Sequence, residues 1–234
     1  MPDSQSVAES MDRKGLLVLG VDTCGPTGSV ALARVEGGGA RMLGKTELAG
    51  RSYSATLVAA VEELLTAGNV KLADLVAIVV ASGPGSFTGV RVGLSAVKGL
   101  AEPGRIPVVA VSRLAVMAAK AGVESAALDA HRHEVFLRLG GEKARELLAG
   151  VEELAGVPVP GGSIAVCDEA AESLLARAWP AATLVRTLAP TAGDAIELCL
   201  PRVLERSFDD LALLDGHYLR RSDAEIFGDT VHHA

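Results

Sequence analysis

Aromatic residues are scarce in this 234-residue chain, where Phe, Trp and Tyr together make up 3% of the sequence. Apolar residues nevertheless reach 49%, so the core has to be built from Val, Leu, Ile and Ala. Positive charge is also in short supply, and the net charge is −7. Because affinity for a phosphate backbone comes from clustered Lys and Arg, this balance argues against an autonomous nucleic-acid-binding protein. It leaves open a subunit that helps another protein to bind RNA.

Cysteines are few and scattered. Cys24, Cys167 and Cys199 are far apart and form no CxxC pair, which argues against a disulfide framework or a zinc knuckle. A reducing compartment is the plain interpretation. Long apolar runs are lacking as well: none approaches the roughly 18 residues of a membrane span, and residues 1–15 have no apolar signal-peptide core. We therefore expect a cytoplasmic protein whose residues 1–13 are disordered.

The first half of the chain alternates short apolar runs with stretches of helical periodicity. Three strands in a meander come first, and units of one helix and one strand follow them. The expected strands are 16–22, 29–35, 40–48, 75–82 and 106–111, and the expected helices are 52–67, 88–101 and 113–122. This order predicts an α/β fold with a mixed sheet, an antiparallel hairpin edge and flanking helices. Such a layer is ribonuclease-H-like and also occurs in the actin, sugar-kinase and Hsp70 superfamily.

The second half has weaker patterns. We expect a strand pair around 124–140, short helical or loop segments over 143–156, and a strand at 163–168. Two helices follow, at 169–179 and 191–207, and Pro201 is expected to kink or break the second one. The remainder is a polar, extended tail. These elements describe a shorter, degraded copy of the first layer. We therefore place an N-terminal ribonuclease-H-like lobe at 14–112 and a smaller C-terminal lobe at 113–234.

A glycine-rich stretch at 80–104 raises the main functional question. Gly89, Gly93 and Gly99 lie inside a predicted helix, where each costs about 1 kcal/mol relative to Ala. Either the preceding turn grips a ligand, or the helix allows another backbone to come very close. The turn at 83–89 could cradle an anion at a helix N-terminus. It matches neither a P-loop nor a dinucleotide-binding fingerprint, and Thr88 is equally a plain N-cap.

A ligand site at this turn would also involve the end of the first strand. Backbone N–H groups in such turns attract anions, but no Lys or Arg occurs between residues 15 and 33. We favour the interpretation that these side chains bond their own turn, and we keep a vestigial phosphate loop as the minority view. Its residues would be Asp22, Thr23, Ser29, Gly83, Gly85 and Ser86.

The helix at 88–101 is apolar on almost all sides, which indicates burial on more than one side. Gly89, Gly93, Ala96 and Gly99 form a stripe of small residues that would permit close backbone approach. Spacing alone supports packing on the protein's own sheet about as well as an interface with another chain.

No catalytic or metal-binding constellation is visible in the sequence. Ser86 has no neighbouring base, and Cys24 has no recognisable His partner. His131 and His133 would share one face of a predicted strand, but no third ligand accompanies them. The basic pair at 220–221 is typical of a solvated tail. We therefore assign no catalytic residue and no metal.

Five segments in the same order together resemble one family. They are VDTCGPTGSVAL, SGPGSFTGVRVGLSAVKGLA, VVAVSRLAVMA, ALDAHRHEVFL and HYLRRSDAEI. The chain is similar to the TsaB (YeaZ) family, the Gcp-like or M22-like subunits of bacterial threonylcarbamoyladenosine biosynthesis in tRNA. The resemblance implies a two-lobed actin-like (ASKHA) fold. It also implies action in the cytoplasm beside a catalytic paralogue, TsaD, and an ATPase, TsaE. The HxxxH metal motif of that paralogue is absent here.

The resemblance favours the interface reading of the helix at 88–101. TsaB-like proteins use the helices that correspond to 52–67 and 88–101 to pair with themselves or with the paralogue. The expected contact residues are Tyr53, Leu57, Val61, Leu64, Gly89, Val90, Gly93, Leu94 and Val97. Where the family usually has an HS dipeptide, this chain has Tyr53-Ser54, so no role of that histidine carries over.

The expected function is thus a non-catalytic scaffold subunit. It would dock on a TsaD-like paralogue that forms N6-threonylcarbamoyladenosine next to the tRNA anticodon, and it would help to recruit a TsaE-like ATPase. We expect no cofactor on the lone chain, ATP or ADP at the complex interface, contact with tRNA only through the complex, and a homodimer as an option for the chain alone. The alternative is an independent actin-like phosphotransferase that binds a nucleotide with Asp22, Thr23 and the turn at 83–89.

Overall fold

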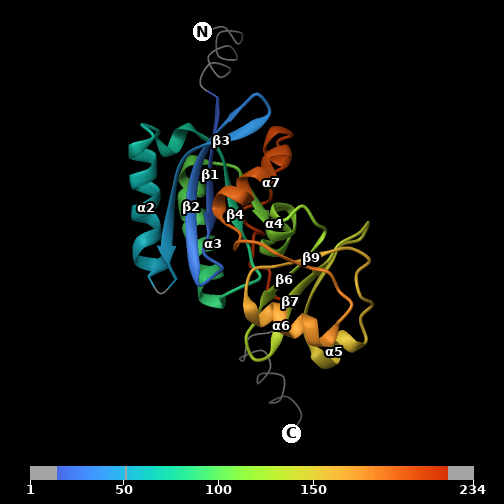
Figure 1. Cartoon of the computed structure of the whole chain (residues 1–234). Helices are drawn as coiled ribbons and strands as arrows, with labels where there is room; N and C mark the ends of the chain where they lie inside the picture. Colours follow the sequence, from blue (N-terminus) through green and yellow to red (C-terminus); the bar gives the residue numbers. More distant parts are fainter. Residues whose placement is uncertain (1–14, 51, 221–234) are drawn as a thin grey trace, which may run out of the picture.

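The computed structural model describes residues 15–50 and 52–220. The tail at 1–13 and Arg221, both discussed above, lie outside the described residues. Two five-stranded sheets form two lobes (Figure 1). The first sheet has the order β3-β2-β1-β4-β5, and the second has the order β10-β9-β6-β7-β8. The two-lobed, actin-like α/β fold expected from the sequence is therefore confirmed.

The first sheet begins with the antiparallel meander of β1 (Leu16–Asp22), β2 (Thr27–Glu36) and β3 (Gly39–Ala49). Strand β4 (Leu75–Ala81) then pairs in parallel with β1, and β5 (Val108–Val111) pairs in parallel with β4. The central strands are continuous apolar runs because both faces of the sheet are covered. At the edge, β3 alternates exposed and half-buried residues, as an edge strand does.

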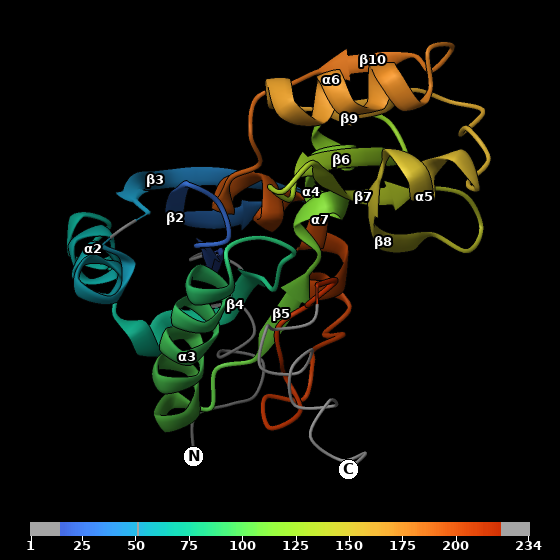
Figure 2. The same cartoon turned by 90° about the horizontal axis from the view of Figure 1, so that it is seen from below.

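Helices cover both faces of the first sheet (Figure 2). On one face lie α2 (Tyr53–Ala67) and α3 (Phe87–Gly104), with the short helix η1 (Leu72–Asp74) between them in sequence. The other face packs against α7 (Ala192–Leu204). A split at residue 112 therefore separates the two sheets but not their helices, because α7 comes from the second half of the chain.

The second sheet has shorter strands: β6 (Ser125–Asp129), β7 (Glu134–Leu139), β8 (Arg145–Gly150), β9 (Ile164–Val166) and β10 (Leu184–Arg186). Helices α5 (Val151–Ala155) and α6 (Glu169–Ala178) contribute to the core on one face. The helix α4 (Arg113–Lys120) packs on the other face and also contacts α7, so α4 and α7 lie between the two sheets.

The structure differs from the expectations for the second half in three places. Residues 145–150 form strand β8 rather than a helix or loop, because they pair along the whole of β7. The edge strand β10 was not expected, since three residues carry no periodic signal. Pro201 does not break α7, which continues to Leu204, and a kink at this residue stays a prediction. Its ring lies in the last turn, where only one backbone hydrogen bond is lost.

The last described segment, residues 207–220, runs between the lobes and is called the C-terminal strap below. Its Asp209 N–H donates to Val108 O at 2.9 Å, and its Leu214 is buried in the core of the first lobe. At its far end, Arg220 pairs with Glu134 and donates to Ala130 O in the second lobe. In Figure 2 the strap is the red segment beside β5.

Candidate functional site

The candidate site lies where β1 ends, at the turn that leads to β2. Asp22 is the last residue of β1, and its Oδ2 lies 3.2 Å from Nε of Arg113 at the start of α4. The two side chains are only 3% and 6% exposed. Asp22 Oδ1 also accepts the Cys24 N–H at 2.8 Å. The carboxylate that would serve a phosphate or metal site in the alternative function is thus occupied by a buried guanidinium.

Arg113 is the functional-site residue that sequence analysis missed. Burial lowers the pKa of its guanidinium, but the negative charge of Asp22, together with Cys24, the hydrogen bond to Asp22 and Cys167, outweighs burial, and the pKa is raised. The pair joins residues 91 positions apart in the chain. One signal in the sequence was available. A buried carboxylate needs a counter-charge, and because no Lys or Arg lies near Asp22 in the sequence, its partner had to come from a distant segment.

The glycines of α3 are explained by close approach to Thr23. The Thr23 hydroxyl donates to Gly89 O at 2.6 Å. A Cβ at Gly89 would lie 2.1 Å from Thr23 O, and a Cβ at Gly93 would lie 2.3 Å from Thr23 Oγ1. The helix therefore needs these two glycines to reach the end of β1. By contrast, a Cβ at Gly99 would meet nothing within 4 Å.

The turn before α3 is bonded to the same strand end. The Ser86 N–H donates to Cys24 O at 2.8 Å, and a Cβ at Gly85 would lie 2.2 Å from that oxygen. Ser86 Oγ accepts the Gly89 N–H, so Ser86 is the N-cap and Thr88 is not. Gly83 has a φ of +114°, which favours glycine, and its carbonyl accepts the Arg113 N–H.

Ser29 lies on the opposite face of the sheet, where its Oγ accepts the Ala192 N–H at the start of α7. The structure therefore brings together Asp22, Thr23, Gly83, Gly85 and Ser86 but directs Ser29 elsewhere. Their polar groups are largely used by one another or by Arg113, which favours the structural interpretation of the turn. Phosphate binding there stays a prediction.

Tyr53, the residue at the usual histidine position, supports the turn between β1 and β2. Its hydroxyl donates to Gly25 O at 2.7 Å. A Cβ at Gly28 would lie 2.7 Å from the Tyr53 ring, so the ring packs directly on the glycine. Burial, together with the charge of Asp22, raises the pKa of Tyr53 to about 12. Tyr53 is therefore a neutral, fixed donor at neutral pH.

The three thiols are not activated. Burial raises the pKa of Cys24 well above its usual value, and the nearby Asp22 charge adds to that effect. Burial also raises the pKa of Cys167, and it raises the pKa of Cys199 to about 11. Because the thiolate is the nucleophilic form, these cysteines are structural at neutral pH.

Histidine ligands are also not assembled. His131 and His133 are exposed residues of the turn between β6 and β7, with φ values of 59° and 63°, and not the strand residues expected from the sequence. Within residues 15–50 and 52–220, no three His, Cys, Asp or Glu side chains are placed to hold a metal ion. In the same part of the chain, no helix has the length and apolar character to cross a bilayer.

The nine expected partner-contact residues face the interior of the chain, and their contact with a partner stays a prediction. All nine residues are buried within the chain itself, because they form the side of α2 and α3 that faces the first sheet. Gly89 and Gly93 face Thr23 of the same chain. Periodicity identified the most apolar side of each helix, and that side is the one a monomer buries.

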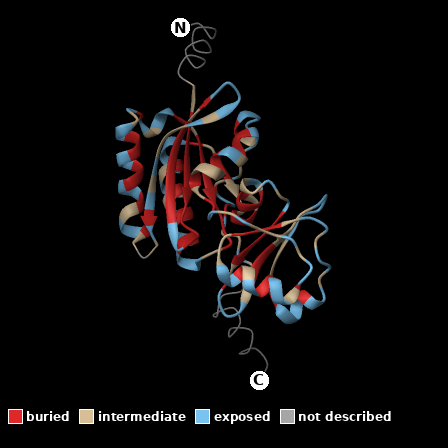
Figure 3. Ribbon diagram, viewed as in Figure 1, coloured by how far each residue is buried: buried red, intermediate tan, exposed pale blue. Residues whose placement is uncertain are grey.

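The outer sides of the same two helices carry exposed residues, most of them small. On α2 these include Ser54, Ala55, Val58 and Ala59, and Val58 is 53% exposed. On α3 the exposed positions include Thr88, Arg91, Ser95 and Gly99. Figure 3 shows the contrast on α2, with buried residues toward the sheet and exposed residues outward. We call these eight residues the outer face.

A second polar cluster joins the two lobes around Glu146 of β8. Its carboxylate accepts the Ser112 hydroxyl at 2.7 Å and Arg138 Nη1 at 3.0 Å. His217 of the strap places Nε2 at 2.8 Å from Glu146 Oε2. Burial raises the pKa of Glu146, but the hydrogen bonds with His217, Ser112 and Arg138 outweigh burial and leave the pKa lowered. These residues line a cleft of about 520 Å³ that also includes Asp215.

We expect Glu146→Gln to lower the free energy of unfolding by about 1–3 kcal/mol at neutral pH, because it removes a charged hydrogen-bond acceptor. Since the folded-state pKa lies below the unfolded value of about 4.3, this contribution is full above that value and is lost as pH falls through the folded-state pKa. Urea denaturation at pH values from 7 to 3 measures the effect. The difference in the free energy of unfolding between Glu146→Gln and the wild type should decrease as the pH falls. The exposed Glu142→Gln is the control; an equal loss in both variants would contradict the role of this cluster.

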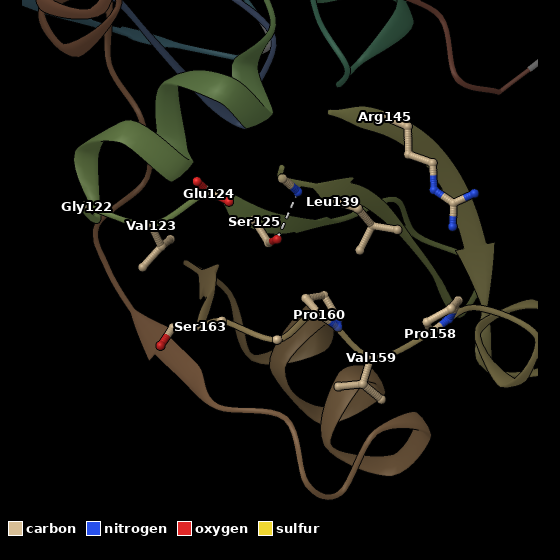
Figure 4. A pocket seen from close by; sticks show the side chains of 13 residues that line it. Gly122, Val123, Glu124, Ser125, Leu139, Arg145, Pro158, Val159, Pro160 and Ser163 are labelled. Atoms are coloured by element: carbon tan, nitrogen blue, oxygen red, sulfur yellow. Dashed lines mark hydrogen bonds between the residues drawn. The ribbon is translucent and has the colours of Figure 1, made fainter. Parts of the chain in front are cut away.

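A larger cleft of about 550 Å³ lies in the second lobe, away from the residues singled out above (Figure 4). It is formed at the ends of β6, β7 and β8 and by the loop at 158–163. Across it, the Gly140 N–H donates to the Ser125 hydroxyl at 3.1 Å. The lining mixes Leu139, Val159 and Pro160 with exposed charges, and no cluster of reactive groups faces it.

Comparison with known proteins gives one consistent result. Residues 46–199 match the sequence profile described as "TsaD: tRNA N6-adenosine threonylcarbamoyltransferase". The protein "tRNA threonylcarbamoyladenosine biosynthesis protein TsaB" of Escherichia coli (strain K12) is 36% identical over 96 residues, which are 38% of this chain and 42% of that protein. Its namesake in Bacillus subtilis (strain 168) is 36% identical over 128 residues, 53% of this chain and 55% of the relative. The chain spans about half the length of the curated relatives it matches.

Among solved structures, YeaZ from Pseudomonas aeruginosa superposes with a TM-score of 0.71 at 28% identity, covering 87% of this chain and all of that one. The two-lobed fold and the profile match place the chain in the class of proteins with a TsaD-type, actin-like domain. Within that class, the chain belongs to the TsaB (YeaZ) family.

Proposed function

We propose that this chain takes part in the biosynthesis of threonylcarbamoyladenosine in tRNA, as a non-catalytic subunit that docks on a TsaD-family partner. The family membership supports the pathway, since the relatives in Escherichia coli and Bacillus subtilis carry that description. The partner would carry out the transfer to N6 of adenosine. A TsaE-like ATPase, ATP or ADP at the interface of the complex, and contact with tRNA through the complex belong to the same proposal.

The outer face of α2 and α3 is the observation that carries the docking proposal. Buried on their inner sides, these helices expose Ala55, Val58 and Ala59 next to Ser95 and Gly99. Small side chains allow a second pair of helices to approach closely. Gly89 and Gly93 are glycines because they pack against Thr23, but nothing in the described part of the chain comes within 4 Å of a Cβ at Gly99. Packing within the chain therefore does not explain why residue 99 is a glycine.

The side chains that could act in catalysis have structural roles, which supports the proposal that the subunit is non-catalytic. The Asp22 carboxylate is paired with Arg113, the thiols are protonated at neutral pH, and Ser86 caps a helix. No observation favours the alternative of an independent phosphotransferase. A calorimetric titration of the lone chain with Mg-ATP is the direct test of that alternative.

The docking proposal predicts the effect of charge on the outer face. Val58→Arg combined with Ser95→Arg should weaken binding to a TsaD-family protein from the same genome at least a hundredfold, because two cations would be buried without partners. The affinity is measured by calorimetry, and tRNA modification by the reconstituted system should fall with it.

Leu188→Arg is the matched control, because Leu188 is 78% exposed and lies outside both helices. This variant should bind like the wild type. Unchanged affinity of the Val58→Arg, Ser95→Arg double variant, with an unchanged thermal unfolding midpoint, would remove the outer face as the docking surface.

A further inference from the structure

Two aromatic side chains at the start of α3 and on the C-terminal strap are exposed and contact each other. Phe87 is 40% exposed and Tyr218 is 36% exposed, and their ring centroids are 5.2 Å apart. The other aromatic residues of the described chain are buried or half-buried. In a chain with 3% aromatic residues, such a pair is conspicuous, because burial of either ring would be favourable.

Both rings are held in place by the surrounding backbone. Phe87 follows the N-cap Ser86, whose N–H is bonded to Cys24 O. Tyr218 lies over Gly216, where an added Cβ would come within 2.4 Å of the ring. The preceding residue, His217, donates its N–H to Ser82 O at 2.7 Å. Contact by a partner would therefore cost little conformational entropy at these side chains.

Arg91 connects the aromatic pair to the outer face. Its guanidinium carbon lies 3.8 Å from the centroid of the Phe87 ring, a cation–π contact. Arg91 is also one of the exposed residues of α3 that define the outer face. The rings and the outer face are therefore one continuous surface.

We propose that Phe87, Tyr218 and Arg91 form an anchor for the TsaD-family partner, at the strap end of the docking surface. This inference rests on the proposed function and extends its contact surface from the two helices to the strap. Aromatic residues and Arg are the residue types that dominate binding energy at protein interfaces. The partner would supply an apolar side chain for Phe87 and a carboxylate for Arg91.

The charges nearby favour a protein over RNA as the occupant. The strap that carries Tyr218 also contains Asp210 and Asp215, two carboxylates that repel a phosphate backbone, while its third carboxylate, Asp209, is paired with Arg202. The Tyr218 hydroxyl has no hydrogen-bond partner among the described residues, so it is available to an acceptor on the partner.

The anchor also lies on the strap that connects the two lobes. Tyr218 follows His217, which contacts Glu146 of the second lobe, and Arg220 reaches Glu134 two residues later. A partner bound at Tyr218 would thus hold the strap in the position in which it joins both lobes.

The test measures binding of the TsaD-family protein by calorimetry to the full chain and to the Phe87→Ala and Tyr218→Ala variants. Each should weaken binding by about tenfold or more. Leu213→Ala is the control, because Leu213 is an apolar residue of the same strap that is 80% exposed. It should bind like the wild type. Thermal unfolding midpoints that match the wild type establish that each variant is folded.

Several results would overturn the anchor. If the Val58→Arg, Ser95→Arg double variant loses binding while both aromatic variants retain it, the proposed function stands and the anchor is wrong. If the wild type itself does not bind the TsaD-family protein, both fail together. If the aromatic variants lose only self-association, or only retention of tRNA, the occupant is a second copy or RNA, and the proposed partner is wrong.

Discussion

Replacing Arg113 by Met should lower the free energy of unfolding by about 3–5 kcal/mol, because it leaves the Asp22 carboxylate buried without a counter-charge. The two side chains are almost fully buried, so solvent screening does little to reduce this loss. A loss of this size is a large fraction of the total stability of a single domain, which is about 5–15 kcal/mol. Urea denaturation of the purified chain measures the effect.

The Asp22→Asn, Arg113→Met double variant is the matched control. It removes both charges, and the Asn side-chain oxygen can still accept the Cys24 N–H. We expect it to recover most of the stability that the Arg113→Met single variant loses. A single variant within about 1 kcal/mol of the wild type would contradict the assignment of this pair as a buried structural element.

Gly89→Ala should destabilise the chain by about 3 kcal/mol or more, since the new methyl group would overlap Thr23 O. The gain in helix propensity, about 1 kcal/mol, opposes this loss and does not cancel it. Gly93→Arg should fail to fold for the same reason, because its Cβ would overlap Thr23 Oγ1. A charged residue at Gly93 therefore cannot serve as a probe of partner docking.

Gly99→Ala provides the comparison within the same helix. A methyl group there meets open space, so only the propensity gain remains, and stability should rise by up to about 1 kcal/mol. Thermal and urea unfolding of the two alanine variants should thus shift in opposite directions. A similar loss in both would mean that the glycines matter for some reason other than approach to Thr23.

The first sheet was predictable in detail because its elements are long and apolar. The strands β1 and β4 are continuous runs of Val, Leu and Ile, and the signal for the helix α2 extends over four turns. The second lobe was less predictable. Strand β8 is half polar and takes its conformation from pairing with β7, which its own residues do not indicate.

The contact face of α2 and α3 shows a different limit of sequence reasoning. Apolar periodicity located Leu57, Val61 and Val97, and the structure buries all three in the core of the first lobe. An outer face of Ala, Ser and Gly has no periodic signal of its own. Only the position of the sheet distinguishes the side of a helix that is left uncovered from the side that is packed.

The sequence by itself determined the α/β layer order and the family, because these depend on local propensity and on strings of neighbouring residues. Only the tertiary structure decided what the unusual residues do. It paired Asp22 with Arg113 from 91 positions away, fitted two glycines against Thr23, and brought Phe87 to Tyr218. Such contacts join segments that are distant in the sequence. Whether a charge is buried, or two backbones come close, is decided only when the chain has folded.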